Sequence, residues 1–267
     1  SSGTAASATR RRLDAAPAFA LDPETTGLNP IQAELVGISF AVCHGQAAYL
    51  PLAHHYAGAP AQLDRAAALA RLKLLLENRE PRIVGQHLKY DRHIFANYGI
   101  ALGGIESSGV VDDTLLQSYV LEAHQSHELG NLAARHLGLA TIRYDDVTGK
   151  GASRIGFEQV DIERASEYAA EDADVTLRVR DALAPQIAAS DKLAFVYRNI
   201  ELPVAEILFR MERAGVLLDR NLLAVQSGEL GRKMLELEQR AYQDAGQPFN
   251  IAAPKQSGDI LFTQKRL

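Results

Sequence analysis

The chain has one cysteine, no tryptophan and two methionines among 267 residues. A single cysteine, Cys43, excludes an internal disulfide framework and fits a reducing compartment. Long apolar runs are also missing, since no stretch approaches the roughly 18–20 residues that a membrane-spanning helix needs. The chain opens on small, polar and then basic residues, which is not a secretory signal pattern. We therefore expect a cytoplasmic protein without a membrane partner.

Positive charge is in short supply as well. The formal net charge is −5 and the sequence pI is near 5.9. A broad duplex-binding surface is not indicated, because its usual footprint is a basic patch. The only basic run, Arg10-Arg11-Arg12, is expected to be a solvated tail. A nuclease is not excluded, because acidic side chains can hold cations that supply positive charge locally.

What the chain does have is a set of well-placed acids, beginning with a pair after a short apolar run. Phe19-Ala20-Leu21 is typical of a buried strand, and Asp22-Pro23-Glu24 follows it. Side chains two apart in a strand face the same way, so Asp22 and Glu24 can share one metal ion. Taken alone, such a pair is more often part of a solvated loop.

Two further segments carry acids of the same kind. Asp91 opens the helical-looking stretch 91–98, where a carboxylate is also simply favoured by the helix dipole. Tyr168 and Asp172 are four apart on a predicted helix and therefore share one face. A phenol there can hold a water for in-line attack while the carboxylate holds a metal ion. The run 171–174 alone is also typical of a solvated helix face.

Together these acids match one chemistry. Four carboxylates from separate elements are what a two-metal phosphodiester hydrolase needs, since two divalent ions clamp the attacking and leaving oxygens. Mg²⁺ and Mn²⁺ prefer hard oxygen ligands, so carboxylates suit them.

At this point a family resemblance can be stated. Three segments resemble the proofreading 3′→5′ exonuclease domain of bacterial DNA polymerase I, in the family A polymerases, of the Asp-Glu-Asp-Asp type with a tyrosine in the third motif. The segments are Leu21-Asp22-Pro23-Glu24-Thr25-Thr26-Gly27-Leu28, Val84-Gly85-Gln86-His87-Leu88-Lys89-Tyr90-Asp91 and Tyr168-Ala169-Ala170-Glu171-Asp172-Ala173-Asp174-Val175-Thr176. The third segment is highly specific. Further along, Arg213-Ala214-Gly215-Val216-Leu217-Leu218-Asp219 resembles the opening of the polymerase domain, and Phe249-Asn250 with Pro254-Lys255-Gln256 resembles its thumb.

The resemblance implies a catalytic role for five residues. It makes Asp22 the ligand that bridges two divalent ions, Glu24 and Asp172 the ligands of the tighter ion, and Asp91 the acid that serves the second. It makes Tyr168 the phenol that orients the attacking water. The expected ions are Mg²⁺, with Mn²⁺ or Zn²⁺ as alternatives.

The resemblance also implies residues that hold the DNA strand. They are Leu28, a wedge beside the terminal base; Tyr144, an aromatic that contacts a base; and Gln86, His87, Tyr90 and Arg135, which hold the single strand. Leu28 and Tyr144 are equally well explained as ordinary packing residues. The family usually has asparagine where His87 stands; a neutral histidine can still donate to a phosphate, with different reach.

Pro23 is a second departure, since the family usually has threonine or an aliphatic residue there. Proline favours extended geometry at Asp22 but removes a backbone donor, which could loosen the strand end that presents both acids.

We expect three regions along the chain. Residues 1–18 are a flexible linker, 19–190 the exonuclease domain, and 191–267 the helical start of the polymerase domain, truncated within its thumb.

The secondary structure is expected as follows. The expected strands are 19–22, 35–42 and 47–51, with shorter ones near 83–85 and 109–111, and a hairpin at Gly45-Gln46. The expected helices are 64–77, 91–98, 113–122, 128–137 and 162–188. A sheet flanked by helices follows, and the resemblance makes it an RNase H-like α/β fold.

Four smaller features complete the expectations. Two later apolar stripes at helical spacing are expected to be core faces: Ile200, Val204, Ile207, Leu208 and Met211, and then Leu230, Met234, Leu237 and Ala241. Cys43 follows the strand-like run 36–42 and is expected to be a small buried side chain. Gly149-Lys150-Gly151 lacks the pattern of a phosphate-binding loop and is expected to be a flexible loop near the DNA strand. His54-His55 is not expected to bind metal, because adjacent rings on a strand end diverge.

The resulting hypothesis is a metal-dependent 3′→5′ exonuclease that releases nucleoside 5′-monophosphates from a single-stranded or frayed DNA 3′ end. We expect it to act as a monomer in the bacterial nucleoid, and not to polymerise DNA by itself. One alternative is an RNA-trimming exonuclease of the ribonuclease D type, against which the polymerase-like segments argue. A second alternative is a DNA-end-binding module without catalysis.

Overall fold

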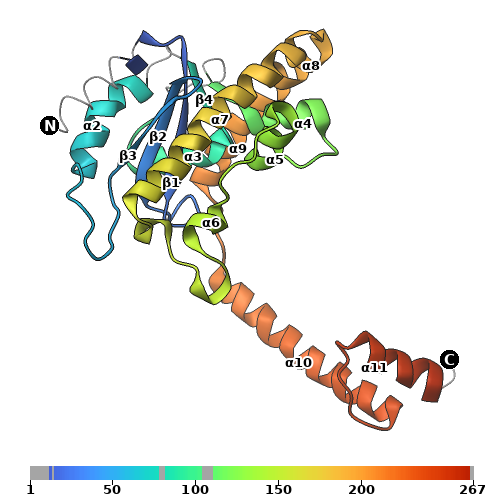
Figure 1. Ribbon diagram of the computed structural model, residues 1–267. Coiled ribbons are helices and arrows are strands. Elements are labelled where there is room, and N and C mark those ends of the chain that lie inside the picture. The colour runs from blue at the N-terminus through green and yellow to red at the C-terminus, as the bar shows by residue number, and fades with distance from the viewer. Residues whose placement is uncertain (1–11, 14, 78–81, 104–110, 265–267) are drawn as a thin grey trace. The chain divides into compact units, whose positions relative to one another are not determined.

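The computed structural model of the protein describes residues 12–13, 15–77, 82–103 and 111–264, and a five-stranded mixed sheet forms the core of the larger of its two compact units (Figure 1). The strands are β1 (Ala18–Thr25), β2 (Leu35–Cys43), β3 (Gln46–Pro51), β4 (Arg82–Gly85) and β5 (Val111–Asp113). Their order in the sheet is β3-β2-β1-β4-β5. β1, β4 and β5 run parallel, while β2 is antiparallel to both β1 and β3. The carboxyl ends of the three parallel strands therefore meet at one edge of the sheet.

Helices cover both faces of this sheet, which confirms the expected α/β class. The helices of this part of the chain are α2 (Arg65–Leu76), α3 (Leu88–Asn97), α4 (Thr114–Glu122), α5 (Leu129–Leu137), α6 (Tyr144–Thr148), α7 (Ile162–Ala188), α8 (Asp191–Phe195) and α9 (Leu202–Ala214). Two 3-10 turns, 151–153 and 157–159, precede α7, and a π-helical stretch at 196–201 precedes α9. On one face, Phe19 and Leu21 of β1 pack in the main core with the buried leucines of α2 and with Ile94 and Phe95 of α3.

The opposite face of the sheet is built from small side chains and receives α7. Ala20 of β1 and Ala41 of β2 lie in one buried cluster with Ala173 of α7. Ala169 and Ala165, one and two helical turns before Ala173, are also fully buried. Small residues on both surfaces let the helix lie close to the sheet. Acidic side chains of β1 on this face can therefore be met by side chains of α7.

Most expected elements are present, with boundaries shifted by a few residues. β1 continues three residues past the expected end, and β5 lies at Val111–Asp113, whereas residues 109–110 of the expected strand lie outside the described residues. α3 begins at Leu88, so Asp91 lies within its first turn and does not open the helix. The early start has a cause, because the Asp113 carboxylate accepts hydrogen bonds from the Leu88 and His87 backbone N–H groups at 2.9 and 3.1 Å.

The β2–β3 hairpin confirms one expectation and corrects another. The strands meet at the expected turn, where Gly45 has a φ of 75°, in the left-handed region that favours glycine. Cys43 is exposed, not buried. It is the last residue of β2 and follows a register shift between Ala41 and Cys43, so it has already left the alternation that buries its neighbours.

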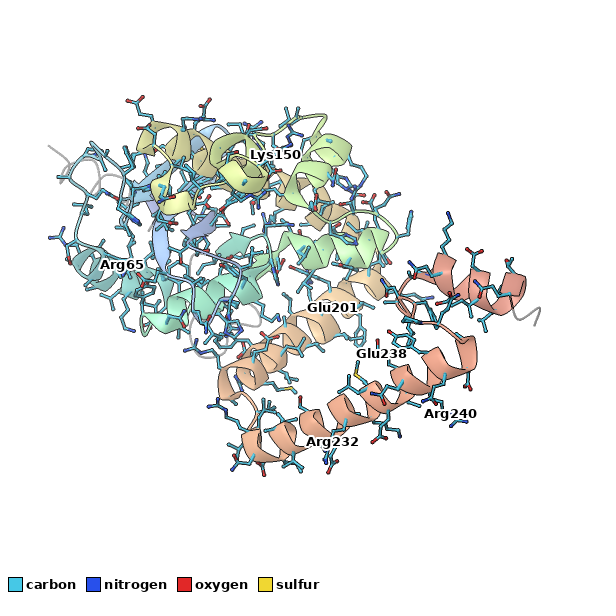
Figure 2. The ribbon with its side chains drawn as sticks, turned by 90° about the horizontal axis from the view of Figure 1, so that it is seen from below. Arg65, Lys150, Glu201, Arg232, Glu238 and Arg240 are labelled. Carbon is cyan, nitrogen blue, oxygen red and sulfur yellow. The ribbon has the colours of Figure 1, made fainter. Side chains whose placement is uncertain are left out.

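The chain divides into two compact units, with the boundary between Ala214 and Gly215. The second unit contains α10 (Arg220–Ala245), α11 (Pro254–Gly258) and a π-helical stretch at 259–264. Arg232, Glu238 and Arg240 lie along α10 (Figure 2). Most of the expected linker, residues 1–11 and 14, lies outside the described residues. The domain boundary expected at residue 190 stays a prediction. Among the described helices, none is long and apolar enough to cross a membrane.

The expectation that the apolar stripes of α9 and α10 form core faces was wrong, because their side chains are largely exposed in the described residues. Ile207 and Met211 of α9 are exposed, as are Leu230 and Met234 of α10. The reason is visible in α9, which turns a different face toward α3. That face carries Glu206, Phe209 and Glu212, which contact Arg92, Lys89 and His93 of α3.

Candidate active site

Three of the predicted acids lie together on the α7 face of the sheet. Asp22 and Glu24 both belong to β1, two residues apart, and Asp172 directly precedes the buried Ala173 of α7. Each offers one carboxylate oxygen, and these oxygens all lie within 4.8 Å of one another. The close approach of α7 to the sheet thus brings acids from distant segments into one cluster.

Burial and mutual repulsion make it unfavourable for all three carboxyl groups of this cluster to be ionised at once. Burial raises the pKa of Asp22 to about 6. Burial, and then the charges of Asp22, Asp172 and Asp91, raise the pKa of Glu24 well above its usual value. The pKa of Asp172 is raised mainly by burial and then by Asp22. Without a cation, the cluster therefore holds protons that a carboxylate in water would release.

Asp91 is the fourth predicted acid, and it reaches the cluster from α3. It is not among the three residues whose oxygens lie within 4.8 Å, but its pKa is raised by burial and then by the charge of Asp22. Its position depends on Gly85 at the end of β4. A Cβ at Gly85 would lie 3.2 Å from Asp91 Oδ2 and 2.5 Å from the Leu88 side chain. Only glycine leaves room for both side chains there.

Tyr168 lies one helical turn before Asp172, and its hydroxyl hydrogen-bonds to the Asp172 carboxylate. Burial and the neighbouring acids raise the pKa of Tyr168, so the phenol stays neutral. Its ring is 5.9 Å from Phe157 and stands edge-on to Tyr144 at 6.2 Å between centroids. Tyr144 also stacks on Phe157, so Tyr144, Phe157 and Tyr168 form one aromatic cluster.

Tyr49 of β3 also lies near the acid cluster, and sequence reasoning missed it. Burial and then the charges of Glu24 and Asp22 raise its pKa. Glu24 pairs across the sheet with Gly37, and a Cβ at Gly37 would lie 2.1 Å from the Tyr49 hydroxyl oxygen. A glycine in the middle of a strand is a signal of such a close approach, and it could have pointed to Tyr49.

His54 holds Tyr49 in place. Its Nδ1 is 3.0 Å from the carbonyl oxygen of Val160, which can only accept, so Nδ1 carries the proton. Nε2 then accepts from the Tyr49 hydroxyl at 2.8 Å. Both ring nitrogens of His54 are therefore occupied within the fold. That the His54-His55 pair does not bind metal stays a prediction.

The loop after β1 is anchored to Tyr90 of α3. The Tyr90 hydroxyl donates to the carbonyl of Gly27 and is 2.6 Å from Thr25 Oγ1. Leu28, which follows Gly27 in the sequence, is 94% exposed. The interpretation of Leu28 as an ordinary packing residue is therefore wrong, whereas its role as a wedge stays a prediction. Tyr144 is partly packed and partly exposed, so both of its interpretations remain open.

The other three predicted strand-holding residues have different surroundings. Gln86 donates to the His127 carbonyl at 2.8 Å and accepts from Thr114 Oγ1 at 2.5 Å, so its amide already has structural partners. His87 is exposed and caps α3 with a φ of 71°. Arg135 donates to Glu122 Oε2 at 2.7 Å and to a backbone carbonyl. Their roles toward DNA stay predictions.

The residues present fit a divalent cation. All four acids offer hard oxygen ligands, and buried Glu24 Oε1 and Asp91 Oδ2 have no hydrogen-bond partner among the described residues. Buried polar atoms are normally satisfied, so two orphaned carboxylate oxygens in one region indicate a missing positive partner. The raised pKa values of Asp22 and Glu24 point the same way.

A mixed sheet flanked by helices, with carboxylates clustered where its parallel strands end, defines a nuclease-like domain. The sequence profile of a family described as 3′-5′ exonuclease matches residues 2–188. The chain therefore belongs to this 3′-5′ exonuclease family.

Known relatives extend the similarity beyond that match. The chain is 50% identical over 253 residues to DNA polymerase I of Pseudomonas aeruginosa, covering 94% of this chain and 27% of the relative. It is 43% identical over 261 residues to DNA polymerase I of Rhizobium leguminosarum, covering 91% of this chain and 25% of the relative. The chain thus spans about a quarter of the length of these relatives. Because 253 aligned residues exceed the 2–188 match, the similarity continues past α7.

Two solved structures share the fold. The POL domain of Pol1 from M. smegmatis, solved with DNA primer-template and dNTP, has a TM-score of 0.73 and 22% identity, covering 97% of this chain and 39% of that one. Brucella melitensis NrnC has a TM-score of 0.53 and 19% identity, covering 76% of this chain and 90% of that one. At these identities the likeness establishes the fold alone.

Proposed function

We propose that this chain is a metal-dependent 3′→5′ exodeoxyribonuclease that removes nucleoside 5′-monophosphates from DNA 3′ ends. It would act as a monomeric proofreading domain within a longer DNA polymerase I. The observation that carries the proposal is the cluster of Asp22, Glu24 and Asp172, whose carboxylate oxygens lie within 4.8 Å of one another. Family membership supports the reaction class, and the similarity that continues past α7 favours a polymerase context over a free ribonuclease.

In this proposal the four acids hold the metal ions. Asp22, Glu24 and Asp172 would hold one divalent ion, and Asp22 with Asp91 a second. The expected ion is Mg²⁺, with Mn²⁺ or Zn²⁺ as alternatives. When bound, such ions supply activation of the attacking water and neutralisation of the leaving oxygen.

Tyr168 would position the water without taking its proton. The hydroxyl donates to Asp172 and keeps its own proton, because burial and the neighbouring acids raise its pKa. Its oxygen lone pairs remain available to accept a hydrogen bond from a water molecule. A group that fixes the line of attack lowers the barrier by orientation.

The strand end would be separated from its partner before cleavage. Leu28 is almost fully exposed on the loop after β1, and Tyr144 presents part of its ring beside Tyr168. An apolar wedge and an aromatic surface can take a terminal base out of its stack, at a cost of a few kcal/mol that is smallest for a mismatch. Stacking on an aromatic ring offsets roughly 1–3 kcal/mol per base.

The test is hydrolysis of single-stranded DNA and RNA of the same sequence, each with Mg²⁺ and with EDTA. We expect nucleoside 5′-monophosphates from DNA in Mg²⁺ only, and none from the Asp22→Asn variant. Glu167→Gln is the matched control, because Glu167 is an exposed acid on α7 next to Tyr168. Preference for RNA would favour the ribonuclease D alternative, and DNA binding without hydrolysis would favour the non-catalytic module; either overturns the proposal.

A further inference from the structure

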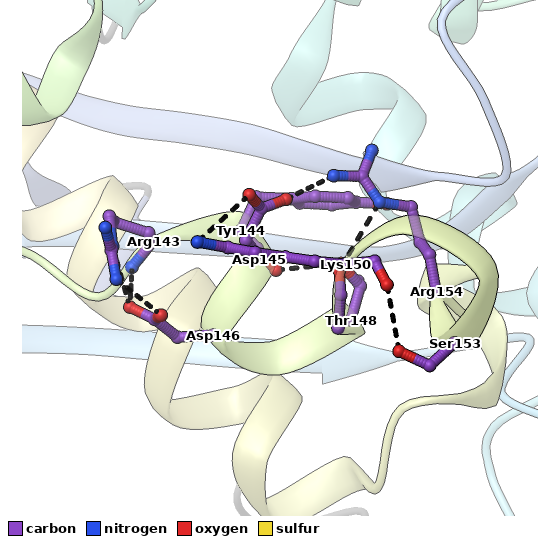
Figure 3. Close-up of polar contacts among 9 residues, drawn as sticks. Arg143, Tyr144, Asp145, Asp146, Thr148, Lys150, Ser153 and Arg154 are labelled. Carbon is purple, nitrogen blue, oxygen red and sulfur yellow. Dashed lines mark hydrogen bonds and ion pairs between the residues drawn. The ribbon is translucent and has the colours of Figure 1, made fainter.

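The segment after α6 is a hydrogen-bonded loop. The Ile155 N–H donates to the Thr148 carbonyl at 2.9 Å. Ser153 Oγ donates to the Lys150 carbonyl, also at 2.9 Å (Figure 3). Arg164 of α7 donates to the carbonyl of Asp146 and so ties α6 to the helix that carries Asp172. We call residues 149–154 the Lys150 loop. The loop backbone is therefore tied to α6, and α6 to α7.

One aromatic ring separates this loop from the proposed catalytic residues. The Arg154 guanidinium carbon is 5.9 Å from the centroid of the Tyr144 ring, and that ring is 6.2 Å from Tyr168. The pKa of Tyr144 is raised by burial and then by the charge of Glu24, and it is lowered by Arg154. The same hydroxyl therefore lies within the electrostatic reach of an acid of the cluster and of a loop cation.

Two loop cations share a single carboxylate. Arg154 pairs with Asp145 Oδ1, and Lys150 Nζ is 3.8 Å from Asp145 Oδ2 (Figure 3). The side chains of Lys150 and Arg154 are 62% and 50% exposed. The group carries one more positive than negative charge and faces solvent, on a chain whose formal net charge is −5.

We propose that Lys150 and Arg154 bind backbone phosphates of the single strand upstream of the nucleotide being removed. Asp145 holds the two cations in place until phosphate replaces it. The inference rests on the proposed function and deepens it by adding a site for the strand beside the cleavage site. Single-strand binders combine stacking rings with cations that follow the backbone, and Arg154 beside Tyr144 supplies both. Guanidinium also pairs with phosphate through two parallel hydrogen bonds.

Binding is tested with a fluorescent single-stranded oligonucleotide in EDTA, where no hydrolysis is expected. Arg154→Ala and Lys150→Ala should each weaken binding about threefold to tenfold. Each should also lower the slope of log affinity against log salt by about 0.7. Asp145→Asn should tighten binding, because it frees both cations. Arg143→Ala is the matched control: it removes a cation that pairs with Asp146, on the other side of α6 in Figure 3, and should leave binding unchanged.

Catalysis separates this inference from the proposed function. Thymidine 5′-monophosphate p-nitrophenyl ester has no upstream phosphate; water attacks its phosphorus, the bond to nitrophenolate breaks and thymidine 5′-monophosphate is released. Arg154→Ala and Lys150→Ala should hydrolyse this ester at the parent rate but show a raised KM on oligonucleotides, with melting temperatures unchanged. If the parent cleaves neither substrate, the proposed function fails. If the parent cleaves both and the variants match it on both, or lose the ester as well, the phosphate site is overturned.

Discussion

Replacing Asp22 by asparagine should make the metal-free protein more stable at neutral pH while it abolishes hydrolysis. Burial raises the pKa of Asp22 from an ordinary value of 3.8 to about 6 in the folded state. A carboxyl group with a raised folded-state pKa stabilises the fold only while it is protonated. That contribution is complete below about pH 4 and is lost as the pH rises toward 6, so at neutral pH the charge of Asp22 opposes folding.

The magnitude follows from the size of the shift. Each pKa unit corresponds to about 1.4 kcal/mol, so a shift of about two units opposes folding by about 3 kcal/mol. Asp22 is not fully shielded from solvent, and screening reduces this value, so we expect a gain of about 1–3 kcal/mol for Asp22→Asn in EDTA at pH 7.5. For a chain of this size each kcal/mol shifts the melting temperature by about 2–4 °C.

The assay is thermal melting of the parent, Asp22→Asn and the control Glu167→Gln, in EDTA and in Mg²⁺, at pH 4 and pH 7.5. In EDTA at pH 7.5 the Asp22→Asn variant should melt highest, and at pH 4 its advantage should disappear. In Mg²⁺ the parent should gain on the variant, since a ligand at 100 times its Kd stabilises by about 2.7 kcal/mol. A variant less stable than the parent in EDTA at pH 7.5 would refute the reasoning, and so would an advantage shared by the control.

Three further predictions concern other residues of the structure. Tyr168→Phe should lower kcat about tenfold to a hundredfold with little change in KM, because it removes an orienting hydroxyl; equal kcat values would make Tyr168 a packing residue. Glu206→Gln should lower the free energy of unfolding by about 3–5 kcal/mol in urea titration, because it leaves Arg92 buried without its charged partner. Mismatched 3′ ends should be degraded faster than paired ends if Leu28 and Tyr144 separate the terminal base, and equal rates on the two would contradict that role.

The acids could be found from the sequence because each lies in a segment with a strong local pattern. The spacing of Asp22 and Glu24 on one strand, and of Tyr168 and Asp172 on one helix, fixes their direction without knowledge of the fold. What the sequence could not supply is the distance between these segments. That distance depends on small side chains on both surfaces, such as Ala20 on β1, which let α7 lie close to the sheet.

Other features could not be predicted because they depend on contacts across several elements. The place of Tyr49 beside Glu24 requires Gly37 on the strand between them. The apolar stripe of α9 looked like a core face, yet α9 packs through charged and aromatic residues on a different side, including Glu206. Periodicity identifies an amphipathic helix, but it does not tell which face the neighbouring helix uses.

The two departures from the family pattern have local explanations that leave the acids in place. His87 adopts a φ of 71° at the start of α3, a region where asparagine and histidine are both enriched, so the exchange preserves a backbone conformation that few other residues favour. Pro23 lies beyond Ala20, the last residue of β1 that pairs with β4, so β1 has a strand neighbour on only one side there. Proline is tolerated on such an open side. Pairing of β1 with β2 continues through Pro23 to Glu24, so the acid pair stays on the regular part of the strand.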